Sequence, residues 1–164
     1  MTNRVRRRWL TAGLALLVSA CAQVPRVPSS PEVPRNQWSG RLALRIDSDP
    51  VQSFHAGFDL RGNAQVGELS LFSPLGSTLA RMAWAPGQAQ LDWNRQQRQF
   101  DSIGALTREA TGTELPIASL FEWLAGRESQ VEGWTADLNA LAQGKLLANR
   151  SQPLPAVQMR LVLD

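Results

Sequence analysis

The chain has 164 residues, 43% of them apolar, and a formal charge of +3 from 17 Lys and Arg against 14 Asp and Glu. This length and apolar share suit a single domain with its own core. Four arginines precede residue 10, so the chain without its first twenty residues carries 13 basic against 14 acidic side chains. A nearly neutral body argues against nucleic-acid binding, which needs a basic face. One Cys, one His and no Tyr exclude a disulfide framework and a Cys/His zinc site, and we expect no metal and no cofactor.

Residues 1–20 have the organisation of a secretory signal peptide. An Arg-rich start leads into an apolar stretch from Trp9 to Val18 and then into the small residues Ser19 and Ala20. The apolar stretch of about ten residues is too short to cross the roughly 30 Å of bilayer hydrocarbon as a helix. The sequence therefore predicts a leader that is removed from the mature protein.

The only cysteine of the chain, Cys21, follows this leader directly. The segment LVSAC at 17–21 resembles a bacterial lipobox, which implies that the leader is cut before Cys21 and that this residue carries acyl chains. The alternative is an ordinary signal peptide followed by a chance cysteine. Ala22 stands where Asp usually signals retention in the inner membrane, which implies an anchor in the periplasmic face of the outer membrane. Residues 21–37 contain four prolines and little to bury, as in an extended tether.

Residues 38–164 are predicted to form one mainly β domain. Apolar and polar residues alternate along 38–46, as in a strand with one buried face. Turn residues separate further strands, giving about six joined by tight turns. After residue 134 two or three more strands follow, and the last of them has on one face Val157, Met159, Leu161 and Leu163.

Two short helices are predicted between these two groups of strands. Ser102 can cap a first helix that ends at Gly112. A second helix over 117–125 follows Pro116 and has apolar residues at i, i+3, i+4 and i+7. Helices with one apolar side, placed between strands of one sheet, should fold across the apolar face of that sheet as a lid.

Five segments follow one another in a characteristic order, namely WSGR at 38–41, LSLFSPLGST at 69–78, GTELPI at 112–117, LFEWLAG at 120–126 and LP at 154–155. Together with the lipobox they resemble the LolB family of outer-membrane lipoproteins. The resemblance implies an unclosed antiparallel β-barrel, a half-barrel with a helical lid that encloses an apolar cavity for acyl chains. Compared with the family pattern, the stretch between Gly126 and Leu154 is short and no Trp-containing tail follows the last strand.

The turn at Pro74, Leu75 and Gly76 joins two predicted strands. Pro suits the second position of a tight turn and Gly the fourth, which leaves Leu75 at the tip. An exposed leucine is common and by itself indicates no function. In the LolB family the leucine of this loop protrudes and delivers cargo into the membrane, so the resemblance implies a membrane-insertion role for this turn.

A set of apolar residues is expected on the inner side of sheet and lid, either as a filled core or as an acyl-chain cavity. A filled core is more common for an arbitrary sequence, whereas the resemblance implies the cavity. Each acyl methylene gains about 0.8 kcal/mol on leaving water, so a triacylated cargo needs a cover in the aqueous periplasm. The predicted residues are Leu42, Leu44, Phe54, Phe58, Met82, Trp84, Leu91, Ile117, Leu120 and Leu124.

The predicted function is that of an outer-membrane lipoprotein receptor without catalysis. It would accept acylated lipoproteins from a periplasmic carrier of the LolA type, insert them into outer-membrane lipid and act as a monomer. One alternative is a structural lipoprotein module of an envelope assembly complex, and another is a membrane-anchored hydrolase. The hydrolase is disfavoured because the sequence has no G-x-S-x-G motif.

Polar residues of the predicted strands suit a solvated outer face. His55 should face away from Phe54 and Phe58, as a solvated strand residue. Four arginines are also expected to face outward, either as plain surface or as a docking site for an acidic carrier; they are Arg41, Arg45, Arg95 and Arg98.

Overall fold

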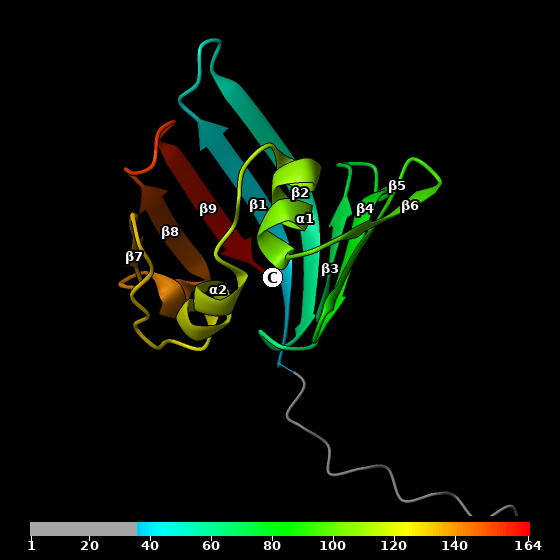
Figure 1. The fold of residues 1–164 in the computed structure, drawn as a ribbon. Helices are drawn as coiled ribbons and strands as arrows, with labels where there is room; N and C mark the ends of the chain where they lie inside the picture. The colour runs from blue at the N-terminus through cyan, green and yellow to red at the C-terminus, as the bar shows by residue number, and fades with distance from the viewer. Residues whose placement is uncertain (1–35) are drawn as a thin grey trace, which may run out of the picture. The chain divides into compact units, whose positions relative to one another are not determined.

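In a computed structural model of residues 36–164, nine strands form one antiparallel sheet, and two short helices lie over one of its faces (Figure 1). Cys21, the predicted leader and most of the predicted tether lie outside these residues. The strands are β1 (Asn36–Ile46), β2 (Gln52–Gly62), β3 (Gly67–Phe72), β4 (Thr78–Ala85), β5 (Gln88–Trp93), β6 (Gln96–Phe100), β7 (Trp134–Asp137), β8 (Lys145–Arg150) and β9 (Val157–Leu163). The helices are α1 (Ile103–Thr111), α2 (Ile117–Leu124) and a single 3-10 turn, η1 (Leu141–Gln143).

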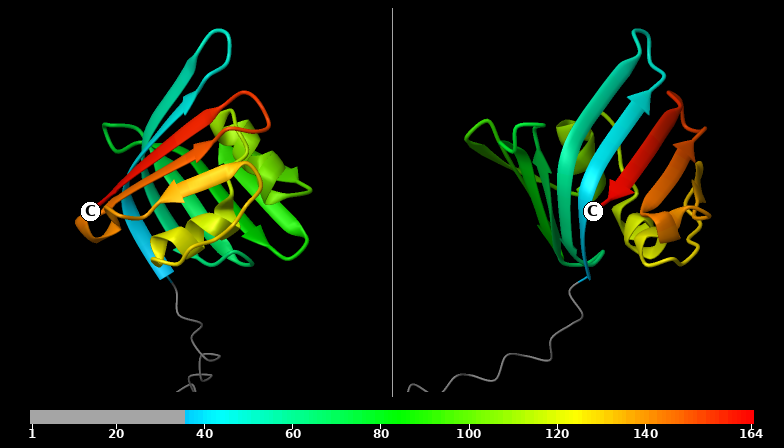
Figure 2. Two further views of the ribbon diagram at one scale, coloured as in Figure 1. Left: turned by 90° about the vertical axis from the view of Figure 1, so that its left-hand side faces the viewer. Right: turned by 180° about the vertical axis from the view of Figure 1, so that it is seen from behind.

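The order of the strands in the sheet is β6-β5-β4-β3-β2-β1-β9-β8-β7. The first six strands form a meander, while β9 pairs with β1 and continues the sheet through β8 and β7. Within the described residues β6 and β7 do not pair with each other, and the sheet curves around the helices as an open half-barrel (Figure 2). The predicted fold class, an unclosed antiparallel half-barrel with a helical lid, is confirmed.

Alternation along the strands decides which side chains face the helices. In β1 the buried residues Leu42, Leu44 and Ile46 alternate with exposed or half-buried ones, as predicted. The register places Leu42 opposite Ala56 of β2 and opposite Leu161 of β9. Because paired residues share a face of the sheet, apolar side chains from three neighbouring strands meet on the side that the helices cover.

Helix α1 begins and ends where its sequence predicts. The Oγ atom of Ser102 accepts a hydrogen bond from the backbone N–H of Ala105 at 3.1 Å. At the other end, the N–H of Gly112 donates to the carbonyl of Arg108 at 2.9 Å. Both bonds satisfy backbone groups that a helix end leaves unpaired, and the helix packs against β4, β5 and β6. None of the helices in residues 36–164 is long and apolar enough to cross a bilayer.

Helix α2 is buried on two sides, and not only on the side that its periodicity predicts. On the inner side the Phe121 ring meets the Trp38 ring edge to face, with centroids 5.7 Å apart. On the other side the Trp123 ring lies 6.5 Å from that of Trp134, and its Nε1–H donates to the carbonyl of Ser129 at 3.1 Å. Helix α2 is therefore held between the sheet and the segment that leads into β7.

The prediction that Arg98 faces outward is wrong. Arg98 of β6 is paired with the buried Leu91 of β5, so both side chains lie on the helix side of the sheet. There the guanidinium forms an ion pair with Glu109 of α1 and lies over the Phe100 ring, 5.3 Å from its centroid. Arg98 is nevertheless exposed to solvent, and so are the other arginines of that prediction, which are Arg41, Arg45 and Arg95.

Gly40 lies in β1 at a point where no side chain fits. Its φ is +153°, and a Cβ there would lie 2.1 Å from the carbonyl oxygen of Val162 in β9. We expect Gly40→Ala to lower the free energy of unfolding by about 2–4 kcal/mol, because backbone strain of about 1–3 kcal/mol adds to the displacement of β9. Chemical denaturation of the purified variants measures the loss.

The control for this substitution is Gly87→Ala. Gly87 also has a positive φ, +73°, but a Cβ there would meet nothing within 4 Å. Its loss should stay at about 1–2 kcal/mol, the cost of the left-handed backbone alone. Equal losses for the two variants would contradict the close approach of β1 and β9 at Gly40.

Candidate functional site

The loop between β3 and β4 is a closed tight turn with Leu75 at its tip. The N–H of Gly76 donates to the carbonyl of Ser73 at 2.9 Å, and the N–H of Ser73 donates to the carbonyl of Ser77 at 2.8 Å. Pro74 and Gly76 thus occupy the predicted second and fourth positions of the turn. The Leu75 side chain is 94% exposed, and the loop contains no charged residue. A large apolar side chain therefore stands free of the sheet in an uncharged loop.

The ten predicted interior residues lie together on the inner side, between the sheet and the helices. Nine of them are buried and Phe54 is half-buried. They come from β1, β2, β4, β5 and α2, and they follow the alternation and the helical spacing predicted for these elements. The residues are Leu42, Leu44, Phe54, Phe58, Met82, Trp84, Leu91, Ile117, Leu120 and Leu124.

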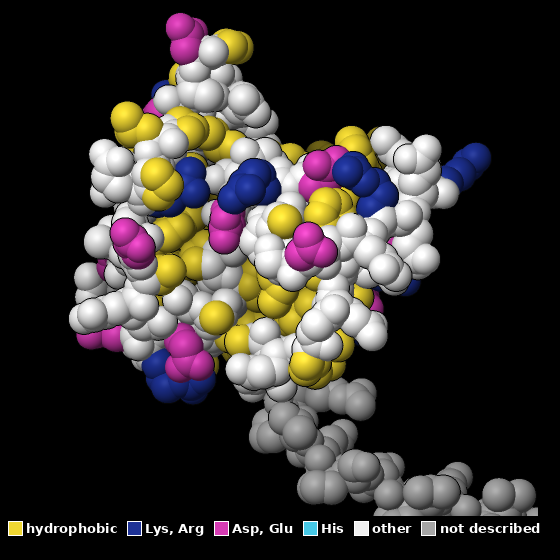
Figure 3. All heavy atoms as spheres, viewed as in Figure 1, with side chains coloured by type: hydrophobic (Ala, Val, Ile, Leu, Met, Phe, Trp, Pro, Cys, Tyr) yellow, Lys and Arg dark blue, Asp and Glu magenta, His cyan; other side chains and the backbone are white. Residues whose placement is uncertain are grey.

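These residues pack with further apolar side chains into one cluster. Leu60 and Met159 also belong to it and are almost completely buried. They are not among the ten predicted interior residues, although the alternation along β2 and β9 places both on this side. Figure 3 shows apolar side chains in a hollow on the helix side of the sheet, with basic and acidic side chains around it. In this conformation the cluster packs on itself, and its role as an acyl-chain cavity stays a prediction.

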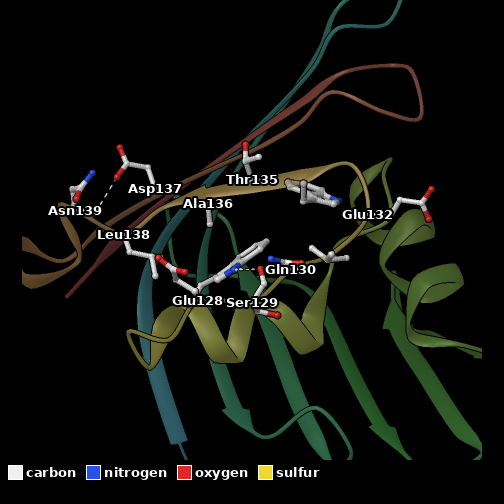
Figure 4. Close-up of a pocket in the computed structure, with 12 residues that line it drawn as sticks. Glu128, Ser129, Gln130, Glu132, Thr135, Ala136, Asp137, Leu138 and Asn139 are labelled. Carbon is white, nitrogen blue, oxygen red and sulfur yellow. Dashed lines mark hydrogen bonds between the residues drawn. The ribbon is translucent and has the colours of Figure 1, made fainter.

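A pocket of about 580 Å³ lies beside the edge strand β7, at a place that no sequence pattern predicts (Figure 4). Its apolar lining includes the rings of Trp123 and Trp134, and three exposed carboxylates border it. The carboxylate of Asp137 accepts a hydrogen bond from the N–H of Asn139 at 2.9 Å. No sequence pattern indicates this pocket, because its lining comes from the end of α2, from β7 and from the irregular segments on either side of β7. The three carboxylates belong to Glu128, Glu132 and Asp137.

A second pocket, of about 480 Å³, lies between the connection from α1 to α2, the start of β7 and the turn from β8 to β9. Arg150 and Thr113 both contribute to its lining. Burial lowers the pKa of the Arg150 guanidinium below its ordinary value, an effect that the charge of Glu114 partly opposes. No sequence pattern predicts a role for these residues either, since an arginine at the end of a strand has no distinctive spacing.

The polar residues of the outer surface form local pairs. The Arg127 guanidinium donates two hydrogen bonds to the Glu122 carboxylate, at 2.6 and 3.1 Å, and these bonds hold the pKa of Glu122 below its ordinary value. His55 is exposed on the face opposite Phe58, as predicted. In the part of the chain that the structure describes, no three His, Cys, Asp or Glu side chains are placed to hold a metal ion together.

Comparison with known proteins relates this arrangement to one family. Residues 35–154 match the family described as "Outer membrane lipoprotein LolB". The outer-membrane lipoprotein LolB of Bordetella petrii is 31% identical over 96% of this chain and 92% of its own length. The corresponding proteins of Chromobacterium violaceum and Cupriavidus taiwanensis are each 34% identical, over 84% and 88% of this chain and 79% and 73% of their own lengths. The chain therefore belongs to the LolB family of outer-membrane lipoproteins.

Proposed function

We propose that this protein is a receptor for acylated lipoproteins at the periplasmic face of the outer membrane. It accepts them from a soluble periplasmic carrier of the LolA type, holds their acyl chains between sheet and helices, and inserts them into the outer-membrane lipid. It acts as a monomer and without catalysis. Cys21 carries the lipid anchor of the receptor itself.

The observation that carries this proposal is the exposed Leu75 on its uncharged turn. Insertion of one leucine into hydrocarbon gains about 1.5–3 kcal/mol, which favours a transient contact with the bilayer but is too little for an anchor. Pro74 and Gly76 shape the turn, so the leucine is presented without a loop that must first become ordered. The turn therefore suits delivery, and the acyl chains on Cys21 supply the permanent attachment.

The cluster under the helices supports the second part of the proposal. Acyl chains gain about 0.8 kcal/mol per methylene when they leave water, so any apolar surface that they reach under the helices holds them strongly. The ten interior residues named above provide such a surface and contribute no charge to it. Cargo then moves downhill in affinity, from carrier to receptor to bilayer.

Thermal unfolding with an acylated ligand tests the proposal. A ligand that binds only the native state stabilises it by about 2.7 kcal/mol at one hundred times its Kd, and we expect a rise in Tm of several degrees with a saturating triacylated lipopeptide. The same peptide without acyl chains is the control. An unchanged Tm with the acylated peptide would favour a structural lipoprotein module over a receptor.

A further inference from the structure

Arg150, at the end of β8, keeps its cationic side chain partly buried without forming an ion pair within the described residues. Its side chain lies over the ring of the cross-strand partner Trp134, with the guanidinium carbon 5.8 Å from the ring centroid. One terminal N–H donates to the carbonyl of Pro155 at 3.1 Å, whereas the Nε atom is buried and has no partner. No acidic side chain of residues 36–164 lies within ion-pair distance of it. A buried donor of this kind is costly unless something accepts its hydrogen bond.

Thr113 lines the same pocket and also has a buried polar atom without a hydrogen-bond partner. It lies in the connection between α1 and α2 and is only 4% exposed. Its carbonyl accepts a hydrogen bond from the hydroxyl of Thr111 at 3.0 Å, but its own hydroxyl oxygen, Oγ1, is buried and has no partner. These two are the buried side-chain atoms without a partner in residues 36–164, and both residues line the pocket of about 480 Å³.

The rest of the pocket indicates what kind of ligand fits. Val131, Trp134 and Leu154 give it apolar walls. Two carboxylates also line it: Glu114, which forms an ion pair with Arg108, and Glu132, which is exposed to solvent. Two unused donors on an apolar wall suit a hydrogen-bond acceptor joined to hydrocarbon. The pocket also includes Pro116, the residue before α2.

Pro116 directly precedes Ile117, the first of the three interior residues on α2, so the pocket adjoins the start of the surface assigned to acyl chains. We propose that the pocket is a head-group subsite, in which Arg150 and Thr113 donate hydrogen bonds to the ester and amide carbonyl oxygens of the cargo's acyl groups. The subsite rests on the proposed function and deepens it, since it fixes the polar end of chains that extend under the helices. Its ligand is defined by the carbonyl, which distinguishes an acyl chain from an alkyl chain of equal length.

A matched pair of amphiphiles tests the subsite. Glycerol 1-monododecanoate and 1-O-dodecylglycerol have the same chain length and head group, but only the ester has a carbonyl. Their Kd values for the full-length protein are measured by displacement of a fluorescent acyl probe. We expect the ester to bind about tenfold more tightly, and we expect Arg150→Met and Thr113→Val to remove this ratio while the ether affinity stays within twofold.

Two controls accompany these variants. Thr113→Ser keeps the hydroxyl and should keep the tenfold ratio. Arg61→Met removes a guanidinium that is bound to Asp59 outside the pocket, and it should also leave the ratio unchanged. Equal binding of ester and ether by the wild type, or a retained ratio in Arg150→Met and Thr113→Val, would overturn the subsite alone. Binding of neither amphiphile would overturn the proposed function together with it.

Discussion

Replacement of Leu75 by Glu should stall cargo on the receptor. The side chain is 94% exposed, so the change should alter the free energy of unfolding by no more than about 0.5 kcal/mol, as at other surface sites. It removes about 1.5–3 kcal/mol of apolar contact with the bilayer and adds a charge that resists hydrocarbon. We expect insertion of cargo into liposomes to slow about 100-fold, with acceptance from the carrier unchanged. A transfer assay from carrier to receptor to liposome, with purified components, measures both steps.

Substitutions of graded size and place make this test specific. Leu75→Phe and Leu75→Ile should insert cargo at nearly the normal rate, and Leu75→Ala should be intermediate, because apolar bulk is what the contact requires. Val66→Glu is the matched control and should leave insertion unchanged. Val66 is also exposed, but it lies in the turn from β2 to β3, at the opposite end of β3 from Leu75. Normal insertion of cargo by the folded Leu75→Glu protein would contradict the membrane-insertion role assigned to the loop.

Loss of the cysteine should detach the receptor from the membrane altogether. Cys21→Ala removes the thiol that carries the predicted acyl chains, each methylene of which contributes about 0.8 kcal/mol to membrane binding. We expect the variant to move from the membrane pellet to the soluble fraction and to show no acyl mass by mass spectrometry. Leu75→Glu is the control, since it should keep both the acyl mass and the membrane attachment. Acyl mass on the Cys21→Ala protein would refute the lipobox.

Local rules predict much of this fold because they act within a few residues. The alternation in β1 identifies the buried face around Leu42 and Leu44, and the cap at Ser102 identifies the start of α1. The tight turn around Leu75 also follows from Pro74 and Gly76, although the role in membrane insertion came only from the family resemblance. Such features depend on neighbours in sequence, which the sequence displays directly.

Features that depend on distant segments could not be predicted in this way. Nothing local indicates that β9 pairs with β1. The second buried side of α2 depends on Trp134, which reaches Trp123 only in the folded chain. The pocket around Arg150 likewise joins three segments that are far apart in sequence. Packing also decides whether the interior is filled or open, and alternation does not carry that information.

The unequal burial of the two helices has a consequence for local unfolding. Helix α2 is covered on both sides, with Trp123 almost completely buried, whereas α1 contacts β4, β5 and β6 and leaves Arg108 exposed to solvent. Segments with fewer buried contacts open at a lower free energy than the rest of a domain. The backbone amides of α1 should therefore exchange with solvent at a lower free energy of local opening than those of α2. If acyl chains enter the interior as proposed, we expect them to enter on the α1 side.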